Sequence, residues 1–432
     1  MENSIAVFGL GFVGLPLSLT YTLFGVKVYG VDINEKYIEN LKHYKTHVLE
    51  NYKGKTIEDI LRESIEKGLF VPTTKTEIAL KNARDIIVTV GIPIENGTLK
   101  KEVFSNAIHS IGKFLKKGDL VLIRSTVPPG TTRNVVKPIL EKESGLICCK
   151  DFYLAYSSER IAEGRAFEEF QTMPVAVGAL SEESKKRAVN LLSIINKEPI
   201  IEASEPEVVE ISKLIENSSR DVNIALSNEL ASFTERLNVD VLEVIKVANT
   251  HKRVHLLTPG VGVGGHCIPY SSLYIFDKSD EIKLPMPLLH TAREINDSRP
   301  LEILSLIESK LNNLGKTVEN SVFALIGIAM KDNSSDISES PAIKMKDNIL
   351  QKGGNVQWFD PNVSGNFPLK KNNLEEALKD ADVVIIPIKQ DNINISAEVI
   401  ANNAKNGCIV FDARRILNRD DVESKGMIYL TV

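Results

Sequence analysis

The stretch Ile5-Ala6-Val7-Phe8-Gly9-Leu10-Gly11-Phe12-Val13-Gly14-Leu15-Pro16 decides the fold. Its first residues are apolar and indicate a buried strand, and Leu15-Pro16 opens a helical pattern. Between them, Gly9, Gly11 and Gly14 allow a tight turn that approaches a pyrophosphate closely, at the partly positive N-terminus of the next helix. Phe12 and Val13 complete this predicted cofactor turn.

An acidic residue follows where a dinucleotide site needs one. The segment Lys27-Val28-Tyr29-Gly30-Val31-Asp32 predicts a second strand that ends on Asp32. A carboxylate there accepts hydrogen bonds from the ribose hydroxyls and repels a 2′-phosphate, so NAD is favoured over NADP. The alternative is that the glycines only allow the helix to pack closely on the strand.

Alternating strands and helices predict an α/β protein with two doubly wound, Rossmann-like domains. In the first part, apolar segments indicate parallel strands at 5–8, 27–31, 85–90 and 119–124. The last third repeats this order at 321–326, 355–359, 382–386 and 408–411. We expect these domains to span residues 1–204 and 301–432. The segment 43–80 looks like an insertion without an assignable role.

Turn segments follow the third and fourth predicted strands. Ile92-Pro93 comes after the third, and Ser125-Thr126-Val127-Pro128-Pro129-Gly130-Thr131 after the fourth. Ligands of open parallel sheets gather at the carboxyl ends of the strands. We therefore expect Thr126 to contact the cofactor.

Residues 205–300 have helical periodicity and almost no strand signal, which predicts a central helical domain with a long connecting helix. Apolar residues recur there at steps of three, four and seven, namely Val208, Ile211, Ile215, Val222, Leu226 and Leu230. This apolar face either joins a second subunit in a homodimer or packs within one subunit.

Composition excludes several classes of protein. The 432 residues are 43% hydrophobic and 25% charged, enough for two or three domains, and a net charge of −5 gives no footprint for nucleic acid. No leader precedes the first strand and no apolar run approaches roughly 20 residues, so we expect a cytoplasmic protein without a membrane partner. Cys148, Cys149 and Cys408 offer no disulfide framework and are expected to fill the core.

The predicted chemistry centres on Cys267, which ends the glycine-rich run Thr258-Pro259-Gly260-Val261-Gly262-Val263-Gly264-Gly265-His266-Cys267. A thiol in a partly open turn can be a nucleophile where a positive charge favours the thiolate. Free cysteines are otherwise more often buried and structural. Beside a redox cofactor, a thiol nucleophile predicts oxidation through a covalent intermediate.

Further polar residues could line such a site. Lys213, Asn217 and Arg220 share one face of a predicted helix, which either lines the site or is a solvated face. The segment from Ser158 to Ala166 carries two glutamates and two arginines, and alone it would be an ordinary exposed helix start. We expect no metal, because His251 and His255 lack a third ligand in a zinc-binding pattern.

Together these motifs resemble the nucleotide-sugar 6-dehydrogenases of the UDP-glucose/GDP-mannose dehydrogenase family, nearly from end to end. The matching segments are 9–14, 125–131, 158–166, 216–230, 248–269, 331–341, 360–361 and 412–417. The resemblance implies NAD-dependent oxidation of the carbon-6 alcohol of a UDP-sugar to a carboxylate, with two NAD reduced per sugar. The product would feed polysaccharide synthesis.

The resemblance also implies roles for single residues. Cys267 would attack the sugar aldehyde, the thiohemiacetal would give up a second hydride, and water would hydrolyse the thioester. Lys213 would exchange protons and stabilise the oxyanion, since a buried cation offsets charge developing on oxygen. Asn217 would help bind the oxyanion, and Glu159 would assist hydrolysis.

The same resemblance implies a set of UDP-sugar contacts. They are Arg160, Ile161, Lys213, Asn217, Arg220, His251, Arg253, Gly264, Lys331 and Arg414. Lys331 and Arg414 would belong to the domain that holds uridine diphosphate, and the site would close between domains with help from a partner subunit. Arg220, His251 and Arg253 favour the branch acting on UDP-N-acetyl-D-mannosamine, while UDP-glucose and UDP-N-acetylglucosamine stay open.

Three residues depart from the family pattern. Ser271 replaces a common aspartate, which puts the hydrolysis step in doubt, and Ser338 replaces an arginine, which weakens a cofactor contact. Ile92 stands where a threonine is frequent, a milder change. The first two departures leave open a different class of function, a protein that binds NAD or a nucleotide sugar without turnover.

Overall fold

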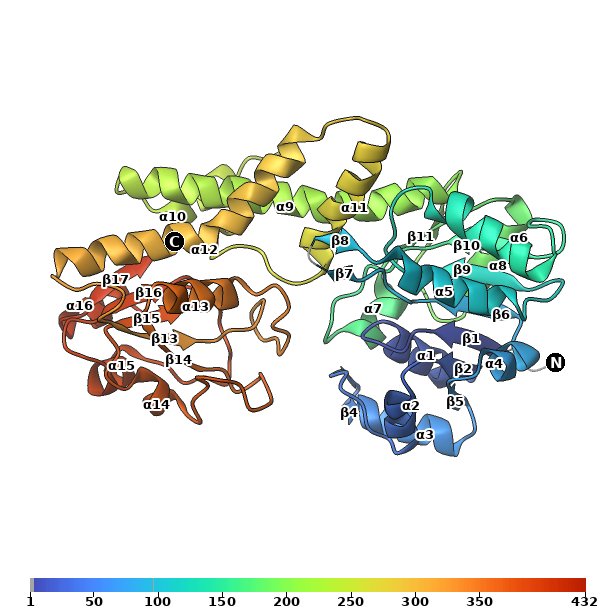
Figure 1. Ribbon diagram of the computed structural model, residues 1–432, viewed down its shortest axis with the longest axis horizontal. Helices are drawn as coiled ribbons and strands as arrows, with labels where there is room; N and C mark the ends of the chain where they lie inside the picture. The colour runs from blue at the N-terminus through green and yellow to red at the C-terminus, as the bar shows by residue number, and fades with distance from the viewer. Residues whose placement is uncertain (1–3, 96) are drawn as a thin grey trace. The chain divides into compact units, whose positions relative to one another are not determined.

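The computed structural model describes residues 4–95 and 97–432, which cluster into two compact units (Figure 1). The first unit consists of Met1–Ile215 and Tyr274–Ile282, and the second of Glu216–Leu273 and Lys283–Val432. Helices α9 (Pro206–Arg236) and α11 (Cys267–Glu281) each contribute to both units. Each unit has its own sheet and its own core.

The first unit contains an eight-stranded sheet in the order β12-β11-β10-β9-β6-β1-β2-β5. The four predicted strands are confirmed as its parallel centre: β1 (Ser4–Phe8), β2 (Lys27–Val31), β6 (Asp85–Val88) and β9 (Leu120–Ile123). Strands β6 and β9 are shorter than expected. The sequence did not predict the outer strands β5 (Phe70–Thr73), β10 (Tyr153–Tyr156), β11 (Val175–Ala179) and β12 (Ile200–Glu202). Strand β11 runs antiparallel to β10.

Helices connect and cover these strands. They are α1 (Gly14–Leu23), α2 (Glu35–Lys42), α3 (Ile57–Glu66), α4 (Thr76–Asn82), α5 (Lys101–Gly112), α6 (Lys137–Ser144), α7 (Ala166–Thr172) and α8 (Glu182–Leu192). A five-residue π-helical turn (Thr132–Val136) precedes α6. Two short hairpins pair β3 (Asn51–Tyr52) with β4 (Lys55–Thr56), and β7 (Ile94–Glu95) with β8 (Thr98–Leu99).

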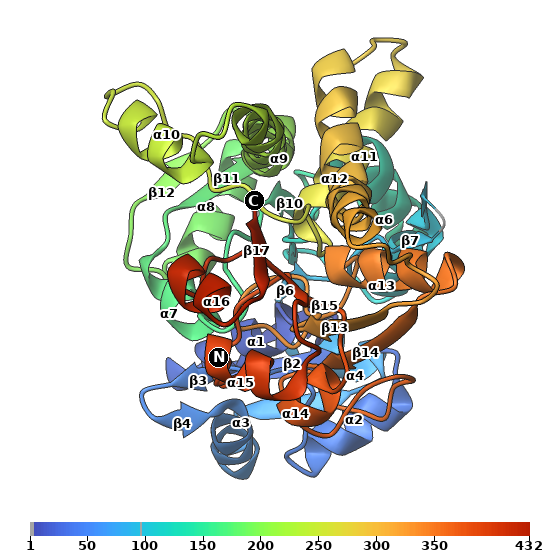
Figure 2. The same ribbon diagram turned by 90° about the vertical axis from the view of Figure 1, so that its left-hand side faces the viewer.

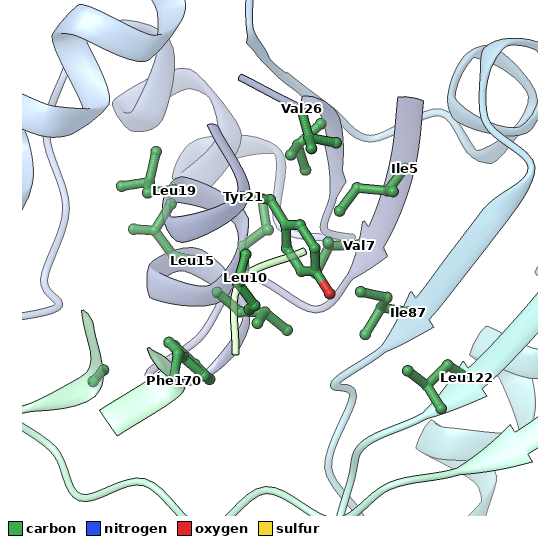
Figure 3. Close-up of a cluster of buried hydrophobic side chains, with 14 of the residues drawn as sticks. Ile5, Val7, Leu10, Leu15, Leu19, Tyr21, Val26, Ile87, Leu122 and Phe170 are labelled. Carbon is green, nitrogen blue, oxygen red and sulfur yellow. The ribbon is translucent and has the colours of Figure 1, made fainter. Parts of the chain in front are cut away.

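The core of the first unit forms where α1 packs on the sheet (Figure 3). Ile5 and Val7 of β1 point toward Leu15 and Leu19 of α1, because alternate strand residues face the same side of a sheet. Tyr21 is fully buried among them, and its hydroxyl donates a hydrogen bond to the carbonyl oxygen of Leu191 at 3.1 Å. Burial raises the pKa of Tyr21 above its usual range.

The segment 43–80 is part of this fold rather than a separate insertion. Its strand β5 pairs in parallel with β2 at the edge of the sheet. A Cβ on Gly30 of β2 would lie 2.7 Å from the ring of Phe70, so glycine leaves the room that this ring occupies. Pro72 lies within β5 and weakens its strand signal, which suits an edge position.

The second unit contains a five-stranded parallel sheet in the order β14-β13-β15-β16-β17 (Figure 2). It confirms the four predicted strands as β13 (Val322–Ile326), β14 (Asn355–Phe359), β15 (Val383–Ile386) and β16 (Ile409–Asp412), and it adds β17 (Ile428–Thr431). Its helices are α13 (Pro341–Gln351), α14 (Leu374–Leu378), α15 (Ala397–Asn403) and α16 (Arg419–Ser424). Alternate strand residues pack against α12 and α13 on one face, and against α14 to α16 on the other.

Helices α9, α10 (Val241–Ala248), α11 and α12 (Pro287–Asn313) confirm the predicted helical region. Within the described chain, no strand interrupts it between β12 and β13. Helix α12 continues through Pro300, where we expected the last domain to begin. On α9, the apolar side chains of Val208, Ile211, Ile215 and Leu226 are exposed, so the expected homodimer stays a proposal.

Two further predictions concern cysteines and membranes. Cys148 and Cys408 are buried as core residues, whereas Cys149 is only half-buried. Every helix of the described chain is too short or too polar to cross a membrane.

Candidate active site

The glycine turn between β1 and α1 has the backbone that the sequence predicts. Gly9 has a φ of +88°, a left-handed conformation that favours glycine. A Cβ on Gly14 would lie 1.8 Å from the Gly9 carbonyl oxygen, so this turn excludes any side chain there. Beside Gly11, by contrast, no described heavy atom other than its chain neighbours lies within 4 Å of a Cβ position. That open space fits the close approach of a pyrophosphate.

Asp32 follows β2 directly and is fixed beside this turn. Its Oδ2 accepts a hydrogen bond from the backbone N–H of Leu10 at 3.0 Å, and its Oδ1 from that of Asn34 at 3.0 Å. The residue is only half-buried, and each carboxylate oxygen keeps a lone pair for a further donor. Asp32 can therefore accept hydrogen bonds from a ribose diol.

The loop after β9 carries the half-buried Thr126 and is held by a buried glutamate of α9. Glu210 accepts hydrogen bonds from the backbone N–H groups of Gly130 at 2.6 Å and Thr132 at 2.9 Å. Burial raises the pKa of Glu210. Sequence analysis missed this residue, because its two partners lie 80 and 78 residues away in the sequence.

Glu159 lies in the loop that connects β10 to α7, and protein donors occupy its carboxylate. Its Oε1 accepts hydrogen bonds from the backbone N–H groups of Arg160 at 2.7 Å and Ile161 at 3.1 Å. Its Oε2 pairs with the buried Arg124, which follows β9. The structure thus brings Glu159, Arg160 and Ile161 together, and it adds Arg124, which sequence analysis did not assign to the site.

The glycine-rich run ends at Cys267, the first residue of α11, whose side chain is exposed. A Cβ on Gly264 would lie 2.9 Å from the carbonyl oxygen of Glu339, and Gly265 has a φ of +78°. The N–H of Gly265 donates to the carbonyl oxygen of Ser338 at 2.9 Å. The glycines therefore let this run pass close to the segment that precedes α13, and they place Ser338 beside it.

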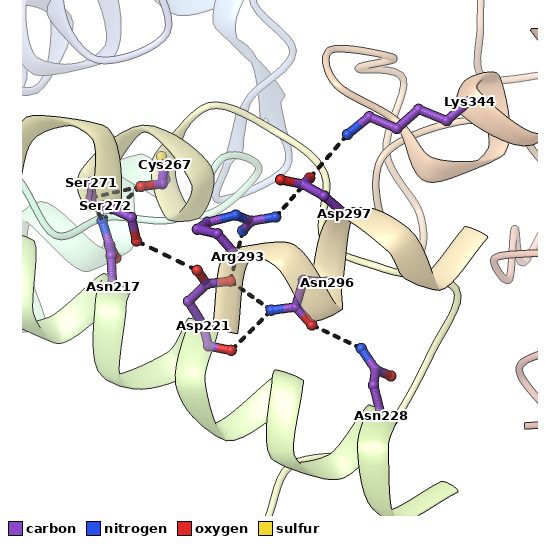
Figure 4. A network of polar contacts seen from close by, with 10 residues as sticks. All are labelled: Asn217, Asp221, Asn228, Cys267, Ser271, Ser272, Arg293, Asn296, Asp297 and Lys344. Atoms are coloured by element: carbon purple, nitrogen blue, oxygen red, sulfur yellow. Dashed lines mark hydrogen bonds and ion pairs between the residues drawn. The ribbon is translucent and has the colours of Figure 1, made fainter. Parts of the chain in front are cut away.

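Asn217 and Ser271 fix the first turn of α11 from α9 (Figure 4). The Asn217 Nδ2 donates to the carbonyl oxygen of Cys267 at 3.1 Å and to Ser271 Oγ at 2.8 Å. Ser271 Oγ in turn donates to the same carbonyl oxygen at 2.7 Å. Both hydrogens of the Asn217 amide nitrogen are used in this way, and both residues are buried. Ser271 thus helps to hold the first turn of α11.

A buried polar network continues from this turn toward α12 (Figure 4). Asp221 accepts hydrogen bonds from Arg293 at 2.7 Å and from Asn296 at 2.8 Å, and Ser272 donates to it at 3.4 Å. Burial raises the pKa of Asp221, although Arg293 beside it acts in the opposite direction. This network ties α9, α11 and α12 together behind Cys267.

The other predicted residues of the helical region differ in burial. On α9, Asn217 is buried, Lys213 half-buried and Arg220 exposed, so a uniformly solvated face is wrong for this helix. His251 and Arg253 are exposed in the turn after α10. The described residues contain no group of three or more His, Cys, Asp or Glu side chains placed to hold a metal ion.

Lys331 and Arg414 both follow strands at the carboxyl edge of the second sheet. Lys331 is exposed in the loop after β13. Arg414 follows β16, where its backbone N–H donates to Asp412 Oδ1 at 3.0 Å and its guanidinium pairs with Asp332. The sheet edge thus carries both predicted cations, in the region where open α/β sheets bind ligands.

Comparison with known proteins covers nearly the whole chain. Residues 3–196, 207–298 and 324–419 match the NAD binding, central and UDP binding domains of the UDP-glucose/GDP-mannose dehydrogenase family. The UDP-N-acetyl-D-mannosamine dehydrogenase of Methanocaldococcus jannaschii is 35% identical, over 98% of this chain and 94% of that protein. Protein CapL of Staphylococcus aureus is 33% identical, over 98% of each chain. The solved structure of UDP-D-ManNAc dehydrogenase from Pyrococcus horikoshii has a TM-score of 0.91 at 31% identity, over 99% of each chain.

Proposed function

This chain belongs to the UDP-glucose/GDP-mannose dehydrogenase family, and we propose that it oxidises the carbon-6 alcohol of UDP-N-acetyl-D-mannosamine to UDP-N-acetyl-D-mannosaminuronate. It is an NAD-dependent nucleotide-sugar dehydrogenase, and its residues 3–196 are the NAD binding domain of that family. The substrate is proposed from relatives that carry this activity in their names. The observation that carries the mechanism is an exposed Cys267 whose peptide is fixed by buried Asn217 and Ser271.

The turn from Gly9 to Gly14 and the carboxylate of Asp32 would hold NAD, which supplies the hydride acceptor for both oxidations. The open space beside Gly11 supports a pyrophosphate there. The lone pairs left on Asp32 support recognition of an unphosphorylated ribose. Thr126, in the loop held by Glu210, would contact the cofactor at the end of β9, which β6 separates from β1.

Cys267 would carry the covalent chemistry. After the first hydride leaves the sugar, the sulfur of Cys267 would bond to the carbon-6 aldehyde and form a thiohemiacetal. Loss of the second hydride gives a thioester, and a water oxygen then replaces the sulfur, releasing the carboxylate and the thiol. The exposure of the side chain at the start of α11 supports this role.

Lys213 would move the proton of the alcohol and stabilise the oxyanion through its positive charge. For Asn217, an oxyanion contact requires one of its two observed hydrogen bonds to open, since both amide hydrogens are used. Its observed bonds support a second role, the orientation of the Cys267 peptide. Glu159 would assist hydrolysis, and the Arg124 pair holds its carboxylate in place.

The UDP-sugar would be recognised by residues of several elements. We assign the contacts to Arg160, Ile161, Arg220, His251, Arg253, Gly264, Lys331 and Arg414. Cations at a sheet edge suit a diphosphate, since guanidinium and ammonium groups bind phosphate oxygens by charge-assisted hydrogen bonds. The exposure of Lys331, His251 and Arg253 leaves these side chains accessible to a ligand.

Turnover of purified protein with three UDP-sugars tests the proposal. We expect NADH formation to have the highest kcat/KM with UDP-N-acetyl-D-mannosamine, compared with UDP-glucose and UDP-N-acetylglucosamine. Mass spectrometry and NMR of the product should identify the uronate. A higher kcat/KM with either other sugar would change the substrate, and binding of the sugars without any NADH would support the non-catalytic alternative.

A further inference from the structure

The segment 43–80 contacts the loop that carries Glu159, Arg160 and Ile161, and Glu50 makes the contact. This glutamate precedes β3 and is only 2% exposed. Its Oε1 accepts a hydrogen bond from the backbone N–H of Gly164 at 2.7 Å, and its Oε2 from that of Ala166 at 3.1 Å. One carboxylate therefore holds two N–H groups at the end of a loop that lies more than a hundred residues further along the chain.

Carboxylates also hold the remaining part of this loop. Glu159 accepts from the N–H groups of Arg160 and Ile161, and Glu169 accepts from that of Ala162 at 2.6 Å. Glu159 and Glu169 belong to the loop and to the helix that follows it, whereas Glu50 comes from a distant part of the chain. Glu50 therefore fixes the Gly164–Ala166 end of the loop to a distant segment, while the pair of Glu159 with Arg124 fixes its beginning to the end of β9.

Burying the charged carboxylate of Glu50 is energetically unfavourable. Burial raises the pKa of Glu50, and the nearby carboxylates of Glu163 and Glu169 raise it further, while the two backbone N–H groups act in the opposite direction. A buried carboxylate is expensive unless it is paired or hydrogen-bonded. Packing alone would be served equally well by an apolar side chain, so the charge points to a need for an acceptor of two N–H groups.

Neighbouring contacts hold the same hairpin without Glu50. The ring of Tyr52 stacks on that of Phe167 with centroids 5.6 Å apart. The side-chain amide of Gln171 donates to the Tyr52 hydroxyl at 3.1 Å. The hairpin therefore packs on α7 through contacts that a change at Glu50 leaves in place, so the fold should tolerate such a change.

We infer that Glu50 is a positioning residue, which holds the Gly164–Ala166 end of the loop so that Glu159, Arg160 and Ile161 are presented to the UDP-sugar. This inference rests on the proposed function, which assigns those three residues to the substrate. Gly164 has a φ of +88°, so a residue with a side chain would strain the backbone at the point where Glu50 binds. The segment 43–80 thereby acquires a function in the site.

The matched pair Glu50→Gln and Glu66→Gln tests the inference by kinetics. Glu66 is exposed on α3 of the same segment and serves as the control. A glutamine keeps one acceptor oxygen, but its NH2 group faces the second backbone N–H. The loop then loses one hydrogen bond to a charged group, and we expect the KM for UDP-sugar to rise about tenfold. The KM for NAD should match that of Glu66→Gln, whereas the melting temperature should fall by a few degrees, because one buried N–H group loses its acceptor. An unchanged KM for UDP-sugar in a folded Glu50→Gln enzyme overturns the inference.

Hydrogen exchange gives a test that does not need turnover, and its first part uses the wild-type chain alone. The amides of Gly164 and Ala166 should be protected, and in folded Glu50→Gln they should exchange faster while those of the Gly9–Gly14 turn do not change. Exchange of both amides at the rate of an unstructured peptide in the wild-type chain contradicts the inference. Absence of NADH with every UDP-sugar would instead overturn the proposed function, and the exchange result would still stand.

Discussion

The two sheets of this protein use the same turn at the end of their first strand, but the aspartate beside the turn is half-buried in one sheet and buried in the other. Gly9 after β1 and Gly327 after β13 have φ values of +88° and +84°. Their N–H groups donate to the last residue of the neighbouring strand, to Val31 at 2.8 Å and to Phe359 at 2.9 Å. An aspartate follows that neighbouring strand in both sheets, Asp32 in the first and Asp360 in the second.

The two aspartates differ in what occupies their oxygens. Asp32 is half-buried and accepts one hydrogen bond at each oxygen. Asp360 is fully buried, and it accepts from the backbone of Ile328 at 2.9 Å and from the Gln390 amide at 3.0 Å, with further donors beside them. The aspartate that follows the second strand thus keeps free acceptor capacity in the first unit, whereas protein donors occupy it in the second.

The largest effect should come from Gly14→Ala, which breaks the turn of the first sheet. The new Cβ would lie 1.8 Å from the Gly9 carbonyl oxygen, so we expect a loss of more than about 4 kcal/mol in the free energy of unfolding. Urea unfolding without cofactor measures it. Gly11→Ala is the control, because its Cβ has open space: it should fold like the wild-type chain but bind NAD more weakly. Similar stability of the two variants would contradict the close contact at Gly14.

A smaller loss is expected for Asp360→Asn. The amide introduces a donor among groups that already donate, so the free energy of unfolding should fall by about 3 kcal/mol. The KM for NAD should stay within about twofold of the wild-type value, because the first sheet is untouched. Unfolding monitored by the fluorescence of Trp358, the single tryptophan of the chain, follows the second unit directly. A large change in the KM for NAD would contradict the difference between Asp32 and Asp360.

The smallest effect on stability is expected for Asp32→Asn, where the change should be seen in cofactor binding. Losing the charge that faces the ribose should weaken NAD binding about tenfold, or about 1.4 kcal/mol, and reduce the preference over NADP. Titration calorimetry with both cofactors measures the two constants. If Asp32→Asn binds NAD as the wild-type chain does, Asp32 does not recognise the ribose.

The strands at the centre of each sheet could be predicted from sequence because they are buried on both faces and therefore continuously apolar. The edge strand β5 could not, because it contains a proline and part-exposed residues. The glycine turn could be predicted because its conformation depends on neighbours in the sequence, and the position of Asp32 follows from the predicted pairing of β1 with β2. Features that depend on short stretches of sequence could therefore be predicted.

Contacts between distant segments were not predictable in the same way. Glu50 and Glu210 are ordinary glutamates in the sequence, and only the fold reveals that each holds two backbone N–H groups of a loop far along the chain. Ser271 was judged as the loss of an acid, whereas the structure gives its hydroxyl two partners. One sequence carries no information on which buried polar groups meet.

The stoichiometry of NADH and uronate, measured for the wild-type chain and for Cys267→Ser, tests the central claim most directly. The account predicts two NADH per uronate for the wild-type chain, and no uronate from the serine variant, because a serine hydroxyl is a far weaker nucleophile than a thiolate at neutral pH. Formation of uronate by Cys267→Ser at the wild-type rate would contradict the account.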